Sequence, residues 1–91
     1  MDSVLLNGLS SALSNYRQAI LRATDQEAKE DYSRLAAITE KVIAAIQAGD
    51  IGQVKLGVLG FSRQVSDAFS TQPPEFKALA EKIAEVRRAV V

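Results

Sequence analysis

Carboxylates are the side chains in this sequence whose types and spacing could do chemistry. The chain contains neither histidine nor cysteine, which removes the commonest general base, the commonest zinc ligands and the strongest side-chain nucleophile. The stretch QEAKED places Glu27, Glu30 and Asp31 close together, and Glu27 shares one side of a helix with either of the others. Such a group could hold a hard cation such as Mg²⁺.

The spacing from Glu27 to Glu30 resembles the ExxE half of the motif in the all-helical nucleotide pyrophosphatases, in which ExxE is followed later by ExxD. That resemblance implies a Mg²⁺-dependent enzyme with these carboxylates as ligands, and we keep it as the alternative function. The second half of the motif is missing, because no aspartate stands at the third position after Glu40, Glu81 or Glu85. We therefore expect no enzyme, metal or cofactor, and interpret the acids as charges that the dipole favours at a helix N-terminus.

Apolar residues that recur at three- and four-residue steps predict four helices, at about residues 3–23, 25–48, 51–70 and 74–90. Thr24 and the glutamate three residues later have the pattern of a capping box that starts the second helix. Gly49 suits the left-handed end of that helix, Asp50 can cap the next, and Pro73 ends the third. The short connections predict an antiparallel four-helix bundle, an all-α fold that forms one small domain over the whole chain, 1–91.

The stretch GDIGQVKLGVLGF sets glycines among large apolar residues. As a helix, it begins one apolar seam that continues past the glycines and consists of Ile51, Val54, Val58, Phe61, Val65 and Phe69. Because successive residues lie about 100° apart, Leu56, Leu59 and Gly52 fall on the opposite side, with Gly57 and Gly60 on one flank. Each interior glycine costs a helix about 0.5–1 kcal/mol, so we expect some contact to benefit from the missing side chains.

Two interpretations of this second apolar side stay open. In the first, the third helix lies centrally, its neighbours cover it, and the glycines let one of them approach closely. In the second, a surface for another chain is formed by Gly52, Leu56, Gly57, Leu59 and Gly60. We favour the second interpretation, because a helix in a four-helix bundle normally needs only one apolar side.

A second candidate surface lies on the first helix, opposite its apolar seam. It consists of small polar residues with scarcely a charge among them: Asn7, Ser10, Ser11, Ser14, Asn15 and Gln18. Depletion of charge is typical of the centres of protein interfaces. An ordinary solvated helix face explains the same residues, and we place this explanation first.

The charges argue against nucleic acids and membranes as partners. Eleven basic residues balance eleven acidic ones, so no net attraction draws the chain to either. Lys82, Arg87 and Arg88 form a small basic end, but cations in the last turns of a helix complement its dipole. A small DNA-binding protein is therefore only a further alternative. The longest apolar run, VIAAI, is too short to span a bilayer.

The sequence as a whole predicts a non-enzymatic protein–protein interaction module. We expect it to self-associate as a homo-oligomer such as a dimer, or to cap, inhibit or scaffold a different protein in a heteromer. The opening stretch MDSVLLNGLSS lacks the basic region and long apolar run of a secretory signal. We therefore expect a cytoplasmic protein.

Overall fold

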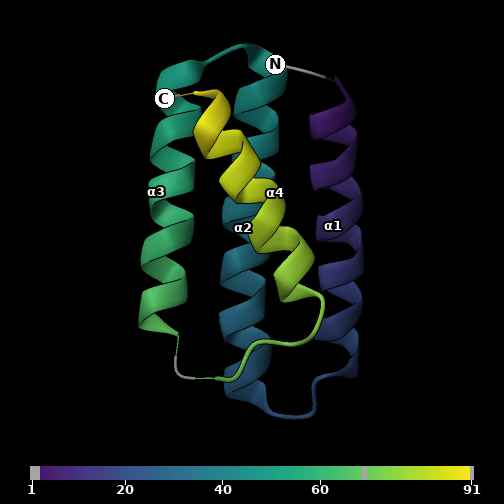
Figure 1. The fold of residues 1–91 in the computed structure, drawn as a ribbon. Helices are drawn as coiled ribbons and strands as arrows, with labels where there is room; N and C mark the ends of the chain where they lie inside the picture. The colour runs from purple at the N-terminus through teal and green to yellow at the C-terminus, as the bar shows by residue number, and fades with distance from the viewer. Residues whose placement is uncertain (1–2, 69, 91) are drawn as a thin grey trace.

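The structure is a computed structural model, and it describes residues 3–68 and 70–90. This part of the chain consists of four helices joined by short connections. They are α1 (Ser3–Arg22), α2 (Gln26–Ala48), α3 (Ile51–Asp67) and α4 (Phe76–Ala89). Successive helices run in opposite directions, as Figure 1 shows. The predicted all-α, antiparallel four-helix bundle is confirmed. None of the described helices is long and apolar enough to pass through a bilayer.

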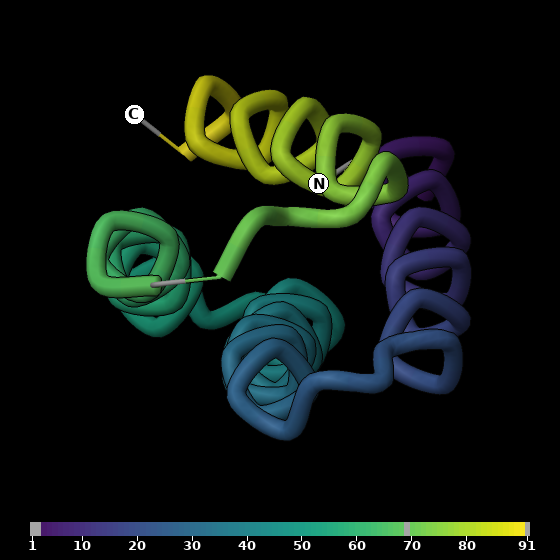
Figure 2. The backbone as a smooth tube through the Cα atoms, turned by 90° about the horizontal axis from the view of Figure 1, so that it is seen from below, coloured from purple at the N-terminus to yellow at the C-terminus, as the bar shows by residue number. Residues whose placement is uncertain are grey.

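The last helix crosses the other three obliquely. In Figure 1, α4 runs from beside α1 at one end of the bundle toward α3 at the other, and Figure 2 shows it spanning the gap between them. The pairs α1–α2, α2–α3 and α1–α4 pack extensively, whereas α3 and α4 touch over a short stretch. The seam between α3 and α4 is therefore the least closed of the bundle.

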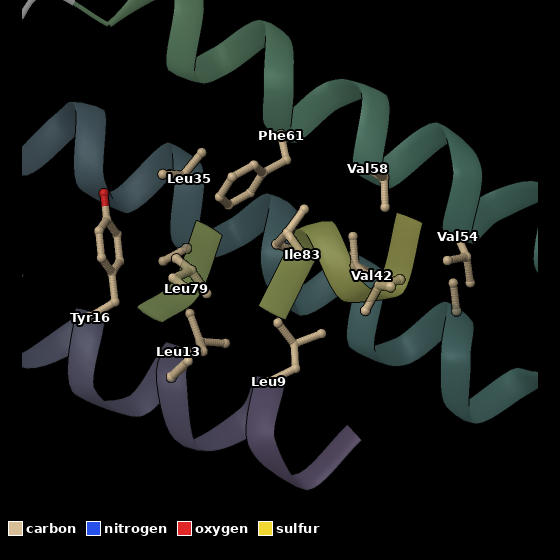
Figure 3. Packing of buried hydrophobic residues seen from close by; sticks show 14 of the residues in the cluster. Leu9, Leu13, Tyr16, Leu35, Val42, Val54, Val58, Phe61, Leu79 and Ile83 are labelled. Atoms are coloured by element: carbon tan, nitrogen blue, oxygen red, sulfur yellow. The ribbon is translucent and has the colours of Figure 1, made fainter. Parts of the chain in front are cut away.

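One apolar face of each helix points into a common core, which Figure 3 shows from close by. The largest fully buried apolar side chains are Leu9, Tyr16, Leu35, Val42, Val54, Leu79 and Val86. The predicted seam of α3 is confirmed at Val54, Val58 and Phe61, which are buried. Ile51 was predicted on the same seam but is 49% exposed, because it is the first residue of α3 and lies at the rim of the bundle. Phe69 lies outside the described residues.

The turn between α2 and α3 has the predicted capping chemistry. Gly49 adopts a left-handed backbone conformation with a φ of 71°, which favours glycine because it has no Cβ to clash. The side chain of Asp50 then accepts a hydrogen bond from the backbone N–H of Gln53 at 3.1 Å, which caps α3. This turn confirms the short antiparallel connection.

Other helix ends differ from the prediction by one to three residues. The predicted Thr24 cap is wrong: Asp25 caps α2, because its carboxylate accepts the backbone N–H of Ala28 at 3.3 Å. The third helix ends at Asp67 rather than near residue 70, because Ala68 turns to an extended conformation. The chain then crosses the end of the bundle before α4 begins at Phe76 rather than residue 74.

The connection from α3 to α4 lies across one end of the core, as Figure 2 shows. Side chains of α1 and α2 hold it there through hydrogen bonds to residues 70–72. The hydroxyl of Tyr16 donates to Gln72 Oε1 at 2.8 Å, and the hydroxyl of Tyr32 donates to the carbonyl of Thr71. We call residues 70–75 the crossing loop. The backbone N–H of Ser70 also donates to Asp31 Oδ2, so two backbone groups of this loop, Ser70 N–H and Thr71 C=O, bond to side chains of α2 and not to a continued helix.

Candidate interaction surface

Leu56 and Leu59 lie on the outer side of α3, where their side chains are 60% and 47% exposed. Gly52, one turn earlier, is also exposed. An added Cβ there would have only the Asp50 carboxylate within 4 Å, at 3.6 Å. The structure therefore places these three residues on a surface that the bundle itself leaves uncovered.

The other two glycines of the predicted surface face α2 instead. A Cβ built on Gly57 would lie 2.6 Å from Val42 Cγ2, closer than real Cβ atoms approach. A Cβ on Gly60 would be 3.9 Å from Ile38 Cγ2. The sequence assigned all five residues to one surface, but the structure divides them. The flank of Gly57 and Gly60 allows α2 and α3 to approach closely, while Gly52, Leu56 and Leu59 face outward.

A groove between α3 and α4 adjoins the exposed Leu59. One cavity of about 540 Å³ is lined by Lys55, Val58, Leu59, Ser62, Arg87 and Val90. A second cavity of about 290 Å³ shares some of these residues and extends along α3 to Val65 and along α4 to Phe76. We call the two together the α3–α4 groove. Its walls are mainly apolar, which is typical of binding sites.

The oblique path of α4 creates this groove. At one end, the rings of Phe61 and Phe76 stack with centroids 6.3 Å apart and planes 8° apart, which joins the two helices. At the other end, buried Val90 lies beyond the last turn of α4. Sequence reasoning missed the groove, because periodicity fixes the apolar face of each helix and not the angle between two of them. The only signal was an apolar residue, Leu59, away from the main seam.

The polar face of α1 is exposed as predicted. Its six residues, on the side of α1 away from the core, are Asn7, Ser10, Ser11, Ser14, Asn15 and Gln18. None of the four main cavities in the described part of the chain is lined by these residues. The structure thus shows a solvated face here and adds nothing that favours it as a contact surface.

The carboxylates of the QEAKED stretch differ in their surroundings. Glu27 and Glu30 are exposed, whereas Asp31 is 3% exposed. Both oxygens of Asp31 already have partners: Oδ1 accepts from Arg34 at 2.8 Å, and Oδ2 accepts the backbone N–H of Ser70 at 3.2 Å. Within the described residues, no three acidic side chains converge in a way that could hold a metal ion. Asp31 therefore joins α2 to the crossing loop.

This role makes Asp31 a source of pH-dependent stability. The hydrogen bond from Arg34 lowers the pKa of the Asp31 carboxyl, and the Ser70 N–H adds to this, although burial acts in the opposite direction. Because the pKa is lower in the folded protein than in the unfolded chain, the ionised carboxylate stabilises the folded state. This stabilisation is fully present at a pH above the unfolded-state pKa of about 3.9, and it is lost as the pH falls through the lower folded-state pKa. We expect Asp31→Asn to unfold at a lower temperature than the wild type at pH 7, with the gap narrowing toward pH 3.

This difference in unfolding temperature is measured by thermal denaturation at pH 7 and pH 3, with circular dichroism as the signal. Glu30→Gln is the matched control, because it removes a neighbouring but exposed carboxylate and should barely change the unfolding temperature at pH 7. An equal gap between Asp31→Asn and the wild type at both pH values would contradict the assigned role.

The basic residues of α4 do not form one patch. The Lys82 side chain lies against Gly8 of α1, where an added Cβ would be 3.1 Å from Lys82 Cε. Its ammonium group pairs with Glu85 at 3.1 Å. Arg87 and Arg88 are exposed, and Arg87 lines the α3–α4 groove. Lys82 therefore serves the contact between α1 and α4, and only Arg87 bears on the groove.

Comparisons of the chain with protein-family models, with curated proteins and with solved structures find no significant match.

Proposed function

We propose that this protein is a non-enzymatic interaction module that receives an apolar helical segment of a protein partner in the α3–α4 groove. One observation carries the proposal: two adjacent helices of the bundle leave an open, largely apolar groove between them, with the half-exposed Leu59 on its border. Laying the apolar face of an amphipathic helix into such a groove is a recurring mode of protein recognition.

The groove supports this function better than the other candidate surfaces do. Leu56 extends the apolar area outward from the groove along α3, and it is more exposed than Leu59. Along the polar face of α1, the exposed large apolar side chains are Val4 and Leu21, which lie near the two ends of the helix and are separated by the six polar residues. On α2, the Asp31 carboxylate already bonds to Arg34 and Ser70, so it could bind a metal ion only by giving up these bonds.

Leu59→Asp is expected to weaken partner binding at least tenfold and to leave the helix content close to that of the wild type. Leu59 is half exposed, so the charge can reach water in the free protein. In the complex the same charge would be buried against apolar groups, which is strongly unfavourable. Leu21→Asp is the matched control, because Leu21 is 76% exposed on α1, away from the groove.

The measurement is a titration of the isotope-labelled protein with an uncharged amphipathic helical peptide that carries leucines at positions i, i+3 and i+7. We expect amide resonances around Val58, Leu59 and Val90 to shift in the wild type and in Leu21→Asp but not in Leu59→Asp. Shifts spread evenly over all four helices, or none at all, would contradict the proposal. Circular dichroism of each variant checks the helix content.

A further inference from the structure

Two positively charged side chains lie on opposite walls of the α3–α4 groove. Lys55 of α3 and Arg87 of α4 line the larger cavity, together with apolar residues and Ser62. No carboxylate lines either groove cavity in the part of the chain that the structure describes. Neither Lys55 nor Arg87 forms an ion pair with another described residue. The groove therefore presents one sign of charge beside an apolar floor, although the whole chain has no net charge.

We infer that the segment that fits this groove is an acidic amphipathic helix of another protein. This inference rests on the proposed function and names the partner's chemistry. Leucine-like side chains of such a helix would cover Val58 and Leu59. Glutamates or aspartates on its flanks would approach Lys55 on one helix and Arg87 on the other. Complementary charge around an apolar centre mainly determines which partner binds and how fast it associates.

The dimensions of the groove set the length of the segment. Along α3 it extends from Lys55 to Val65, a distance of about 15 Å at 1.5 Å per residue. A partner helix of about three turns spans this distance. Three turns offer apolar anchors at positions i, i+3 or i+4, and i+7, which is the usual pattern for helices that bind in grooves.

Charge also distinguishes this partner from a second copy of the chain. A two-fold symmetric dimer places the same patch on both sides of its interface. Such an interface would bring together two patches of the same sign of charge, because Lys55 and Arg87 line the groove in both copies, and this is unfavourable. A membrane surface fits less well than a helix, because most of the apolar residues here line a hollow between two helices, and only Leu59 and the neighbouring Leu56 are strongly exposed beside it.

The test compares three fluorescent peptides that share one set of leucine anchors and differ in their flanking residues, which are glutamate, glutamine or lysine. Fluorescence anisotropy with the full chain gives each dissociation constant at low salt and at 0.5 M salt. We expect the glutamate peptide to bind at least tenfold more tightly than the lysine peptide at low salt. Because salt screens charges at the protein surface, this ratio should shrink at 0.5 M.

Reversing the two positive charges of the groove tests whether they determine which peptide binds. The double variant Lys55→Glu, Arg87→Glu should prefer the lysine peptide over the glutamate peptide. The matched control, Lys29→Glu, Lys41→Glu, makes the same change in net charge on α2, outside the groove, and should keep the original order. Circular dichroism confirms that both variants remain helical.

The other possible outcomes overturn the acidic partner, the groove as an interaction site, or both. Equal binding of all three peptides would leave the groove as an interaction site and overturn the acidic partner. No binding of any peptide would overturn both proposals. A concentration-dependent dimer seen by light scattering, and abolished by Leu59→Asp, would overturn the inference in favour of a second copy. Tighter binding of anionic vesicles than of the glutamate peptide would overturn it in favour of a membrane.

Discussion

Gly57→Ala is expected to destabilise the protein by about 1–3 kcal/mol, although alanine is the better helix former by almost 1 kcal/mol. The new Cβ would lie 2.6 Å from Val42 Cγ2. Val42 cannot easily move aside, because it is fully buried and a β-branched side chain in a helix has one strongly preferred rotamer. The helices α2 and α3 must therefore separate slightly, which loosens the contact that Gly57 makes possible.

Chemical denaturation of Gly57→Ala and of three further variants isolates this steric cause. Gly52→Ala is the control on the same helix, and it should stabilise the protein by up to about 1 kcal/mol, because an added Cβ there meets only the Asp50 side chain. Val42→Ala should cost about 2 kcal/mol by itself. The double variant Val42→Ala, Gly57→Ala should be more stable than the sum of the two single effects predicts. Strict additivity would contradict the proposed clash.

Tyr16→Ala is expected to cause the largest loss of stability, about 3–5 kcal/mol, because it empties the space of a fully buried aromatic ring. The ring also packs edge-on against Tyr32, with centroids 5.8 Å apart. Burial raises the pKa of the Tyr16 hydroxyl, so the group stays protonated and donates to Gln72 throughout the range in which proteins are usually studied. Losing the side chain therefore removes both core packing and one support of the crossing loop.

Tyr16→Phe separates these two contributions. It keeps the ring and removes only the donor to Gln72, so we expect a loss of about 1 kcal/mol, measured by urea denaturation. Limited proteolysis offers a local readout, because a loop released from Tyr16 should be cut faster near residues 70–72. A Tyr16→Phe variant as unstable as Tyr16→Ala would mean that the hydrogen bond, and not the ring, dominates. An unchanged proteolysis rate would contradict the role of Tyr16 in holding the loop.

Hydrophobic periodicity was enough to predict the number, type and direction of the helices. It works here because each helix buries one apolar face, as Leu79 and Ile83 do on α4. Helix ends were less predictable, since they depend on tertiary contacts. After the early end of α3, the crossing loop is held by hydrogen bonds to α1 and α2, between residues far apart in sequence.

The candidate site could be predicted only in part. The sequence placed Leu56 and Leu59 away from the seam of α3, and both are exposed. It also grouped Gly57 with them, because residue spacing gives the angle around a helix and not which neighbour occupies that side. Whether α2 or solvent lies beside Gly57 depends on how the helices assemble. For the same reason, the sequence could not show that Lys55 and Arg87 line one groove, since these residues belong to different helices.

The packing of α1 bears on how the chain folds as it is synthesised. This helix lies against α2 and α4. Because α1 precedes both in the sequence, it leaves the ribosome before either of them, and α4 follows well after α2. At roughly 5–20 residues per second, the apolar face with Leu9 and Leu13 waits several seconds for α4. Helices themselves form in microseconds. Translation, not helix formation, therefore determines how long the nascent α1–α2 hairpin exposes a surface that chaperones or other nascent chains can bind.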